Sequence, residues 1–151
     1  MQTTTTPVPI SEHPYAPQWL RRAKTSGARI TVEEGRVTWH AGDWLDGDWY
    51  GGVWLDGNWY GGVWHGGDWH GGHWFGGRWH AGDWHGGHWL DGHWLNGIWH
   101  DGIWHDGMWH AGHWYDGDWH GGTWHGGHWF GGHWHAGDWL YGTWHGGTAI
   151  D

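Results

Sequence analysis

The sequence contains no cysteine, which excludes disulfide bonds and thiolate metal sites. Lys and Arg together number six, and no apolar run is long enough to cross a bilayer, so we predict no membrane insertion. The opening residues, MQTTTTPVPI, lack the cationic start and apolar stretch of a signal peptide. Aliphatic residues are too few for an ordinary core. The 34 Gly, 23 Trp and 19 His therefore indicate a core that is built from tryptophan.

Charge is divided between two parts of the chain. Residues 1–36 contain five basic and three acidic side chains, whereas residues 37–151 contain thirteen Asp and one Arg. This division suggests two surfaces with different roles. The acidic repeat is not expected to bind nucleic acid directly, because it would repel the phosphates.

One five-residue repeat, Trp-x-x-Gly-x, runs through residues 38–147 without a slip. Neither an α-helix nor a long flat strand has a period of five, and Gly at every fifth position disfavours a helix. A fixed short period predicts an all-β solenoid, in which each unit forms one side of a coil and Gly makes the corner. The constant tryptophans should form ladders inside, because so many exposed indoles would aggregate. They are Trp39, Trp44, Trp49, Trp54, Trp59, Trp64, Trp69, Trp74, Trp79, Trp84, Trp89, Trp94, Trp99, Trp104, Trp109, Trp114, Trp119, Trp124, Trp129, Trp134, Trp139 and Trp144.

Read as Gly-x-Trp-x-(Gly/Ala/Asp), as in Gly-Asp-Trp-His-Gly at 67–71, the unit resembles the pentapeptide-repeat family. The resemblance covers residues 37–148 and implies a right-handed, four-sided β-helix with about 20 residues per coil. The sequence departs from the family by placing Trp at every central position, and Asp or Asn before it only sometimes, as at Asp43 and Asn58. A weaker local resemblance to MORN repeats covers residues 50–57, Tyr-Gly-Gly-Val-Trp-Leu-Asp-Gly.

The variable positions also favour four units per coil, because side chains about 20 residues apart would then stack. At that spacing histidines align in three columns, which are His65, His85, His105, His125 and His145; His73, His93, His113 and His133; and His80, His100 and His120. Three units per coil would scramble these columns. Each buried indole N–H would need an acceptor, and a corner carbonyl is the nearest candidate.

Residues 1–36 form an N-terminal arm in front of the repeat, and residues 149–151 form a short tail behind it. The Thr- and Pro-rich start is expected to be extended, and a short helix is predicted from Pro17 to Ser26. Residues 29–39 alternate like two strands around a Glu-Glu-Gly turn and should cap the first coil.

Histidine is the first candidate for chemistry, since eighteen of the nineteen lie in the repeat beside a Trp. Both neighbours of an inward strand residue point outward, so His ladders should follow the outer faces. Two imidazoles on adjacent coils can share Zn, Ni or Cu. The candidate ligands are His65, His73, His85, His93, His105, His113, His125, His133, His135 and His145. The alternative is a stacking surface residue with adventitious metal uptake and no required cofactor. In either case, stacked imidazoles predict a loss of stability in acid.

Aspartate is the second candidate, at six corners just before Gly: Asp46, Asp56, Asp91, Asp101, Asp106 and Asp116. Asp-Gly is favourable turn chemistry, and calcium binding is the alternative. No catalytic set stands out, because Cys is absent, Ser is scarce, and Asp and His are too abundant for a pair to be informative. A convex rod also offers no obvious pocket. We therefore predict that the protein is not an enzyme.

Apolar and basic side chains are candidates for contact with protein partners or with further copies of the chain. They are Leu90, Leu95, Ile98, Ile103 and Met108 in the repeat, and Trp19, Arg21 and Arg22 in the N-terminal segment. Leu140, Tyr141 and Ile150 are expected to cover the open C-terminal end of the solenoid.

These features favour a non-catalytic structural or binding rod, anchored in a larger assembly by its N-terminal segment. A bacteriophage decoration, tail or fibre protein, or another microbial surface structure, would suit this architecture. One alternative is an acidic DNA mimic that inhibits gyrase, as some pentapeptide-repeat proteins do, which would place the chain in the cytoplasm. Another alternative is a transition-metal binder that uses the His ladders.

Overall fold

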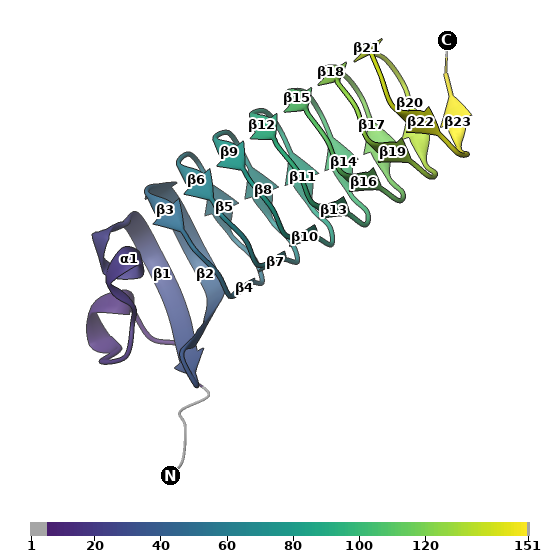
Figure 1. Ribbon diagram of the computed structural model, residues 1–151. Coiled ribbons are helices and arrows are strands. Elements are labelled where there is room, and N and C mark those ends of the chain that lie inside the picture. The colour runs from purple at the N-terminus through teal and green to yellow at the C-terminus, as the bar shows by residue number, and fades with distance from the viewer. Residues whose placement is uncertain (1–5, 151) are drawn as a thin grey trace.

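The computed structural model describes residues 6–150, which form a rod of stacked coils with a small head at the N-terminal end (Figure 1). The head contains the 3-10 helix η1 (Ile10–Glu12), the helix α1 (Gln18–Arg22) and the strand β1 (Lys24–Glu33), which pairs with β2 (Arg36–Asp46). Each later strand has two residues, and all but the last end on a Trp: β3 (Asp48–Trp49), β4 (Val53–Trp54), β5 (Asn58–Trp59), β6 (Val63–Trp64), β7 (Asp68–Trp69), β8 (His73–Trp74), β9 (Arg78–Trp79), β10 (Asp83–Trp84), β11 (His88–Trp89), β12 (His93–Trp94), β13 (Ile98–Trp99), β14 (Ile103–Trp104), β15 (Met108–Trp109), β16 (His113–Trp114), β17 (Asp118–Trp119), β18 (Thr123–Trp124), β19 (His128–Trp129), β20 (His133–Trp134), β21 (Asp138–Trp139), β22 (Thr143–Trp144) and β23 (Thr148–Ala149).

From β2 onward the strands stack in parallel on three faces. Each strand pairs with the strand three places further along the chain, and the long strand β2 also pairs with β4. Face A contains Trp39 and every fifteenth residue after it, so that Trp39 pairs with Trp54. Face B starts from Trp44 in the same way, and β2 supplies the first strand of both faces. Face C has seven strands and starts from Trp49. About seven coils make a rod of about 34 Å at the usual spacing between strands.

The all-β parallel solenoid is confirmed, but the four-sided coil is wrong. Cα partners along each face are separated by three repeats, as Trp84 and Trp99 are, so a coil has three sides. The apparent columns at a spacing of 20 arose because histidine is common enough to align by chance. Three sides need sharper corners than four, and Gly supplies them because it alone adopts strongly positive φ at low cost.

Both the backbone conformation and the short distance to the preceding coil require glycine at the corners. Gly87 has a φ of +107°, and a Cβ built on it would lie 2.5 Å from the carbonyl oxygen of Gly72 on the preceding coil. The missing side chain would therefore point at the neighbouring coil rather than into the centre of the rod. That close approach lets the carbonyl of Gly72 accept a 2.9 Å hydrogen bond from the N–H of His88.

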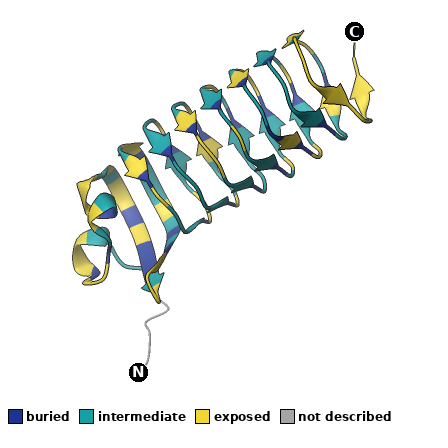
Figure 2. Ribbon diagram, viewed as in Figure 1, coloured by how far each residue is buried: buried dark blue, intermediate teal, exposed yellow. Residues whose placement is uncertain are grey.

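Tryptophan fills the interior, which confirms the inward orientation. The indoles from Trp39 to Trp129 have no exposed surface, and buried residues recur from coil to coil along the rod as far as Trp134 (Figure 2). Along a face the rings stack with centroids 4.6 to 5.1 Å apart and planes within 10° of parallel. Within a coil, successive rings meet edge to face at 5.7 to 5.9 Å, as Trp129 does with Trp134 and Trp54 with Trp59. Both arrangements are favourable for aromatic rings, so ring contacts stabilise the core along the rod and within each coil.

The indole N–H groups turn toward the corners of the next coil. Those of Trp99, Trp104, Trp109 and Trp114 each donate a 3.1 Å hydrogen bond to the carbonyl of the residue 17 positions ahead. This confirms the predicted acceptor at these four positions. The indole nitrogens at all the other positions from Trp39 to Trp129 are buried with no hydrogen-bond partner among the described residues, so the prediction fails there.

The head closes the N-terminal end of the rod. β1 runs antiparallel to β2, and its residue Ile30 is fully buried with Leu20 of α1. Trp19 packs edge to face on Trp49 with a centroid distance of 5.3 Å. The predicted strand pair and Glu-Glu-Gly turn are present, and Glu34 of that turn has a φ of +52°. The predicted helix is shorter than expected, because the chain already enters β1 at Lys24.

Among residues 6–150, none covers the opposite end of the rod, contrary to the expectation that apolar residues would do so. Leu140, Tyr141 and Ile150 are 49%, 77% and 44% exposed, and they do not fold over the last coil. Trp144 consequently keeps 38% of its surface exposed. The reason is the strand geometry, because side chains that flank an inward position point outward and cannot reach across the open end.

Candidate functional site: imidazole pairs on the outer faces

The residues that flank each Trp project outward and meet across neighbouring coils. The residue before a Trp lies diagonally beside the residue that follows the Trp on the next coil, 17 positions later. We call this arrangement a diagonal slot. The slot places two side chains from different coils on one face, where the backbone ladder holds both in register.

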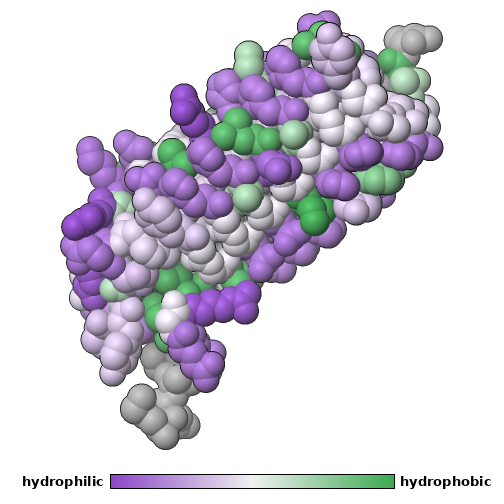
Figure 3. Space-filling model, viewed as in Figure 1, coloured by the Kyte–Doolittle hydropathy of each residue, from purple (hydrophilic) through white to green (hydrophobic). Residues whose placement is uncertain are grey.

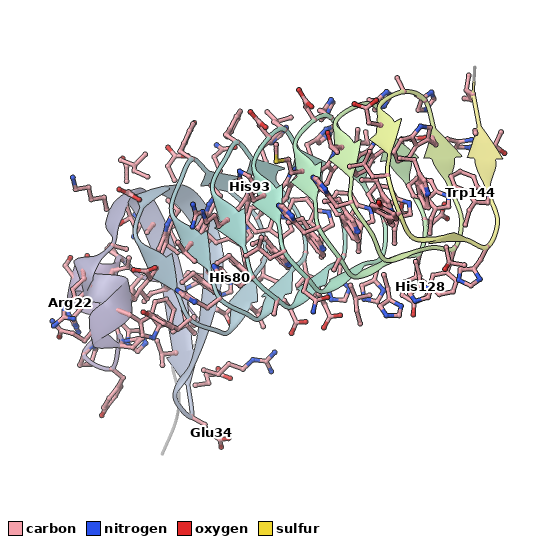
Figure 4. All side chains as sticks on the ribbon, turned by 45° about the horizontal axis from the view of Figure 1, so that its top comes forward. Arg22, Glu34, His80, His93, His128 and Trp144 are labelled. Carbon is pink, nitrogen blue, oxygen red and sulfur yellow. The ribbon has the colours of Figure 1, made fainter. Side chains whose placement is uncertain are left out.

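Three diagonal slots bring two imidazoles together, one slot on each face. Nδ1 of the first histidine lies 3.1 to 3.2 Å from Nε2 of the second. The pairs are His88 with His105 on face B, His93 with His110 on face C, and His128 with His145 on face A. Figure 4 shows His93 and His128 on different sides of the rod.

Four other slots place a carboxylate against an imidazole. His65 and His100 have Nε2 3.2 Å from an Asp oxygen, whereas the corresponding distances at His85 and His135 are 3.6 and 3.5 Å. The carboxylates belong, in the same order, to Asp48, Asp83, Asp68 and Asp118. All eight side chains are about one third to one half exposed, so these contacts contribute little to stability.

Stacked histidine files do follow the outer faces, but at spacings of 15 or 17 rather than 20. On face B the rings of His73, His88, His105, His120 and His135 form one file, with centroids 4.5 to 5.7 Å apart. The columns expected from a spacing of 20 do not exist. Their members fall on successive faces, as His65, His85 and His105 do on faces C, A and B.

The structure brings together some of the predicted ligands and separates others. His93, His105 and His145 lie in imidazole pairs, but their partners were not among the predicted ligands. Those partners are His88, His110 and His128. A spacing of 17 between two histidines would have identified these partners. That spacing predicts a contact only on a coil with three sides.

Burial and neighbouring imidazoles together lower the pKa of several histidines. Burial is the first cause that lowers the pKa from its ordinary value of 6.5 at His40, His70, His80, His88, His105 and His110. Except at His40, the second cause is the charge of a neighbouring histidine on the same face, which opposes protonation.

These shifts predict acid destabilisation. Above pH 6.5 the affected histidines are neutral in both states, and their contribution to stability is fully present. As the pH falls below 6.5, the unfolded chain binds protons that the folded chain binds less readily, so the free energy of unfolding decreases. We expect a melting temperature lower by several degrees at pH 5 than at pH 7.5, measured by circular dichroism.

The matched variant for this prediction is His105→Phe, because Phe75 already occupies the equivalent position on face B. It removes one imidazole whose pKa is lowered and preserves the stacked file. We expect the variant to show a smaller melting-temperature difference between the two pH values. An identical melting temperature at both pH values in the parent protein would contradict the prediction.

The corner aspartates accept hydrogen bonds from the backbone of the turns. Asp46, Asp56, Asp91, Asp101, Asp106 and Asp116 each accept a hydrogen bond of 2.8 to 2.9 Å from the N–H of the following Gly. Asn96 does the same. Among residues 6–150, no group of three or more His, Asp or Glu side chains surrounds a single point that could hold a metal ion. The carboxylates are therefore explained by turn formation.

The apolar side chains considered for partner contacts encircle the rod. Ile98 lies on face A, Leu90 and Ile103 on face B, and Leu95 and Met108 on face C. They therefore do not gather on one face. Figure 3 shows separate apolar patches on a largely hydrophilic surface.

The basic and aromatic candidates belong to the head. Trp19 packs against the core, and Arg21 donates hydrogen bonds to the carbonyls of His13 and Ala16 at 2.6 and 3.1 Å. Arg22 is exposed at the end of the rod opposite Trp144 (Figure 4). Of these three side chains, Arg22 is therefore the one most open to a partner.

No protein-family model, curated protein or solved structure matches the chain. Among the described residues, no helix is long and apolar enough to cross a membrane. The three-sided coil also differs from the four-sided helix that the resemblance to pentapeptide-repeat proteins implied.

Proposed function

We propose that the protein is a non-catalytic structural rod, anchored by its N-terminal head in a larger assembly such as a bacteriophage virion. The observation that carries the proposal is that the repeat and the N-terminal head have different structures. A constant Trp core with Gly corners builds about seven similar coils, and a separate head covers their N-terminal end. A rod whose core is independent of its outer residues can vary those residues without losing its shape.

The head has the properties of an anchor. The first 36 residues hold five of the six basic side chains of the chain, whereas the repeat is strongly acidic. The head also has a surface hollow between η1, α1 and the start of β1, lined by residues that include Pro9, Ile10, Arg21 and Ala28. Basic charge at one end of an acidic rod favours one orientation on an acidic partner surface.

The test is sedimentation of particles from cells that produce the full chain. The expected result is that the parent protein sediments with large assemblies, and that Arg22→Glu reduces this fraction several-fold. Arg78→Glu is the matched control, because it makes the same charge change at an exposed position of the repeat. Parent protein that remains entirely in the low-mass fraction would contradict the proposal. Equal losses from both variants would contradict the role of the head.

A gyrase-inhibiting DNA mimic is the second candidate, and the thirteen Asp residues of residues 37–151 favour it. The acidic side chains do not form a continuous file, since Asp68 and Asp83 stand together on face A and Ile98 follows them. Inhibition of gyrase supercoiling by the purified chain, without sedimentation in large assemblies, would favour the mimic over the rod.

A further inference from the structure

The three imidazole pairs have a recurring geometry that the structural role of the rod does not require. In each pair a hydrogen bond of 3.1 to 3.2 Å joins Nδ1 of one ring to Nε2 of the other. The two rings come from adjacent coils whose backbones are hydrogen-bonded at both positions. For His88 and His105, these bonds run from Ile103 N–H to the carbonyl of Gly87 and from His105 N–H to the carbonyl of Trp89. The two nitrogens of each pair are therefore close in the metal-free protein, where a proton lies between them. A metal ion would take the place of that proton, with each ring turned so that its lone pair faces the ion.

The separation of the nitrogens suits chelation of one metal ion. Bonds of about 2.0 to 2.1 Å from each imidazole to a transition metal are usual. A metal bound to two nitrogens 3.1 Å apart would then have an N–metal–N angle of about 100°. That value lies between the angles of square-planar and tetrahedral sites, which copper, nickel and zinc adopt.

We propose that the pairs His88–His105, His93–His110 and His128–His145 are chelating sites for divalent copper, nickel or zinc, with copper bound most tightly. Imidazole nitrogen suits these metals, and the usual order of affinity places copper first. Each pair supplies two ligands, in agreement with the absence of any larger ligand group among the described residues. Water, or a side chain of another molecule, completes the coordination.

The proposal distinguishes these six histidines from the others in the files. His120 stacks on His105 at a centroid distance of 5.7 Å, but the other side chain of its own diagonal slot is Ile103. His120 therefore lies in the same file and is exposed like His105, with no second imidazole nitrogen across its slot. It provides a control close to the proposed site.

The test is calorimetric titration of the full chain with Cu²⁺, and separately with Zn²⁺, in a buffer that does not bind metals. We expect the parent protein to bind three Cu²⁺ ions, His88→Ala to bind two, and His120→Ala to bind three. Melting curves of both variants should match the parent, because these side chains lie outside the Trp core. With His93 and His128 both changed to Ala, one Cu²⁺ should remain, with two nitrogen ligands in its paramagnetic resonance spectrum.

Two results would overturn the proposal. If His88→Ala and His120→Ala weaken binding equally, or neither does, the ions bind adventitiously to exposed imidazoles. If seven ions bind, the four Asp–His slots take metal as readily as the three pairs, and the assignment to imidazole pairs is wrong.

Discussion

Gly87→Ala is expected to destabilise the rod by at least about 3 kcal/mol, although it adds only one methyl group. The φ of +107° at Gly87 costs about 1–3 kcal/mol for a residue with a side chain. The added Cβ would also lie 2.5 Å from the carbonyl oxygen of Gly72 and 3.0 Å from its nitrogen. Because that oxygen accepts the ladder hydrogen bond from His88, the two coils cannot separate without weakening the bond.

Gly86→Ala is the matched control for this prediction. Its Cβ would lie 3.4 Å from the carbonyl of His70, which is an ordinary contact. Ala81 and Ala111 already occupy the equivalent place in other repeats. We expect Gly86→Ala to leave stability unchanged or to raise it by about 0.4–1 kcal/mol, because it restricts the unfolded chain. Urea unfolding followed by circular dichroism measures both variants. Equal midpoints for the two would show that the corner does not require Gly.

Trp99→Ala is expected to cost about 3–5 kcal/mol or more, because it removes a fully buried indole from the middle of the core. Trp99 stacks on Trp84 and Trp114 at 4.9 and 4.6 Å, and it donates a hydrogen bond to the carbonyl of Asp116. A defect in one coil also weakens the coupling between the coils on either side. We therefore expect unfolding to become less cooperative as well as easier.

Trp144→Ala tests whether the stability lost with an indole depends on its position along the rod. Trp144 is 38% exposed and has one stacking neighbour, Trp129, at 5.1 Å. Ala149 already takes the position of Trp in β23, where it pairs with Trp134. We expect Trp144→Ala to cost roughly a third of the loss at Trp99, since less buried area is removed. Similar losses for the two variants in urea unfolding would contradict a core whose stability depends on neighbouring coils.

The candidate site could be predicted only in part. The outward position of histidine follows from its place beside an inward Trp, and the structure contains His files on the outer faces, although not in the predicted columns. Which histidines meet depends on the number of repeats per coil. His88 and His105 are 17 positions apart, and that spacing has no significance on a four-sided coil. The predicted ligands therefore included His105 but not the partner that faces it.

The sequence by itself determined the solenoid, the inward tryptophans, the corner glycines and the hydrogen-bonding turns at Asp. Each of these follows from a local rule: the five-residue period, the burial of indole, the conformational freedom of Gly, or the short reach of a carboxylate. Only the tertiary structure decided the number of sides, the side-chain pairs on the outer faces, and which end of the rod is closed. The number of sides depends on how three or four indoles pack around an axis and on how sharply each Gly turns. A repeat in which every unit has the same Trp and Gly contains no local signal that counts the units in a coil.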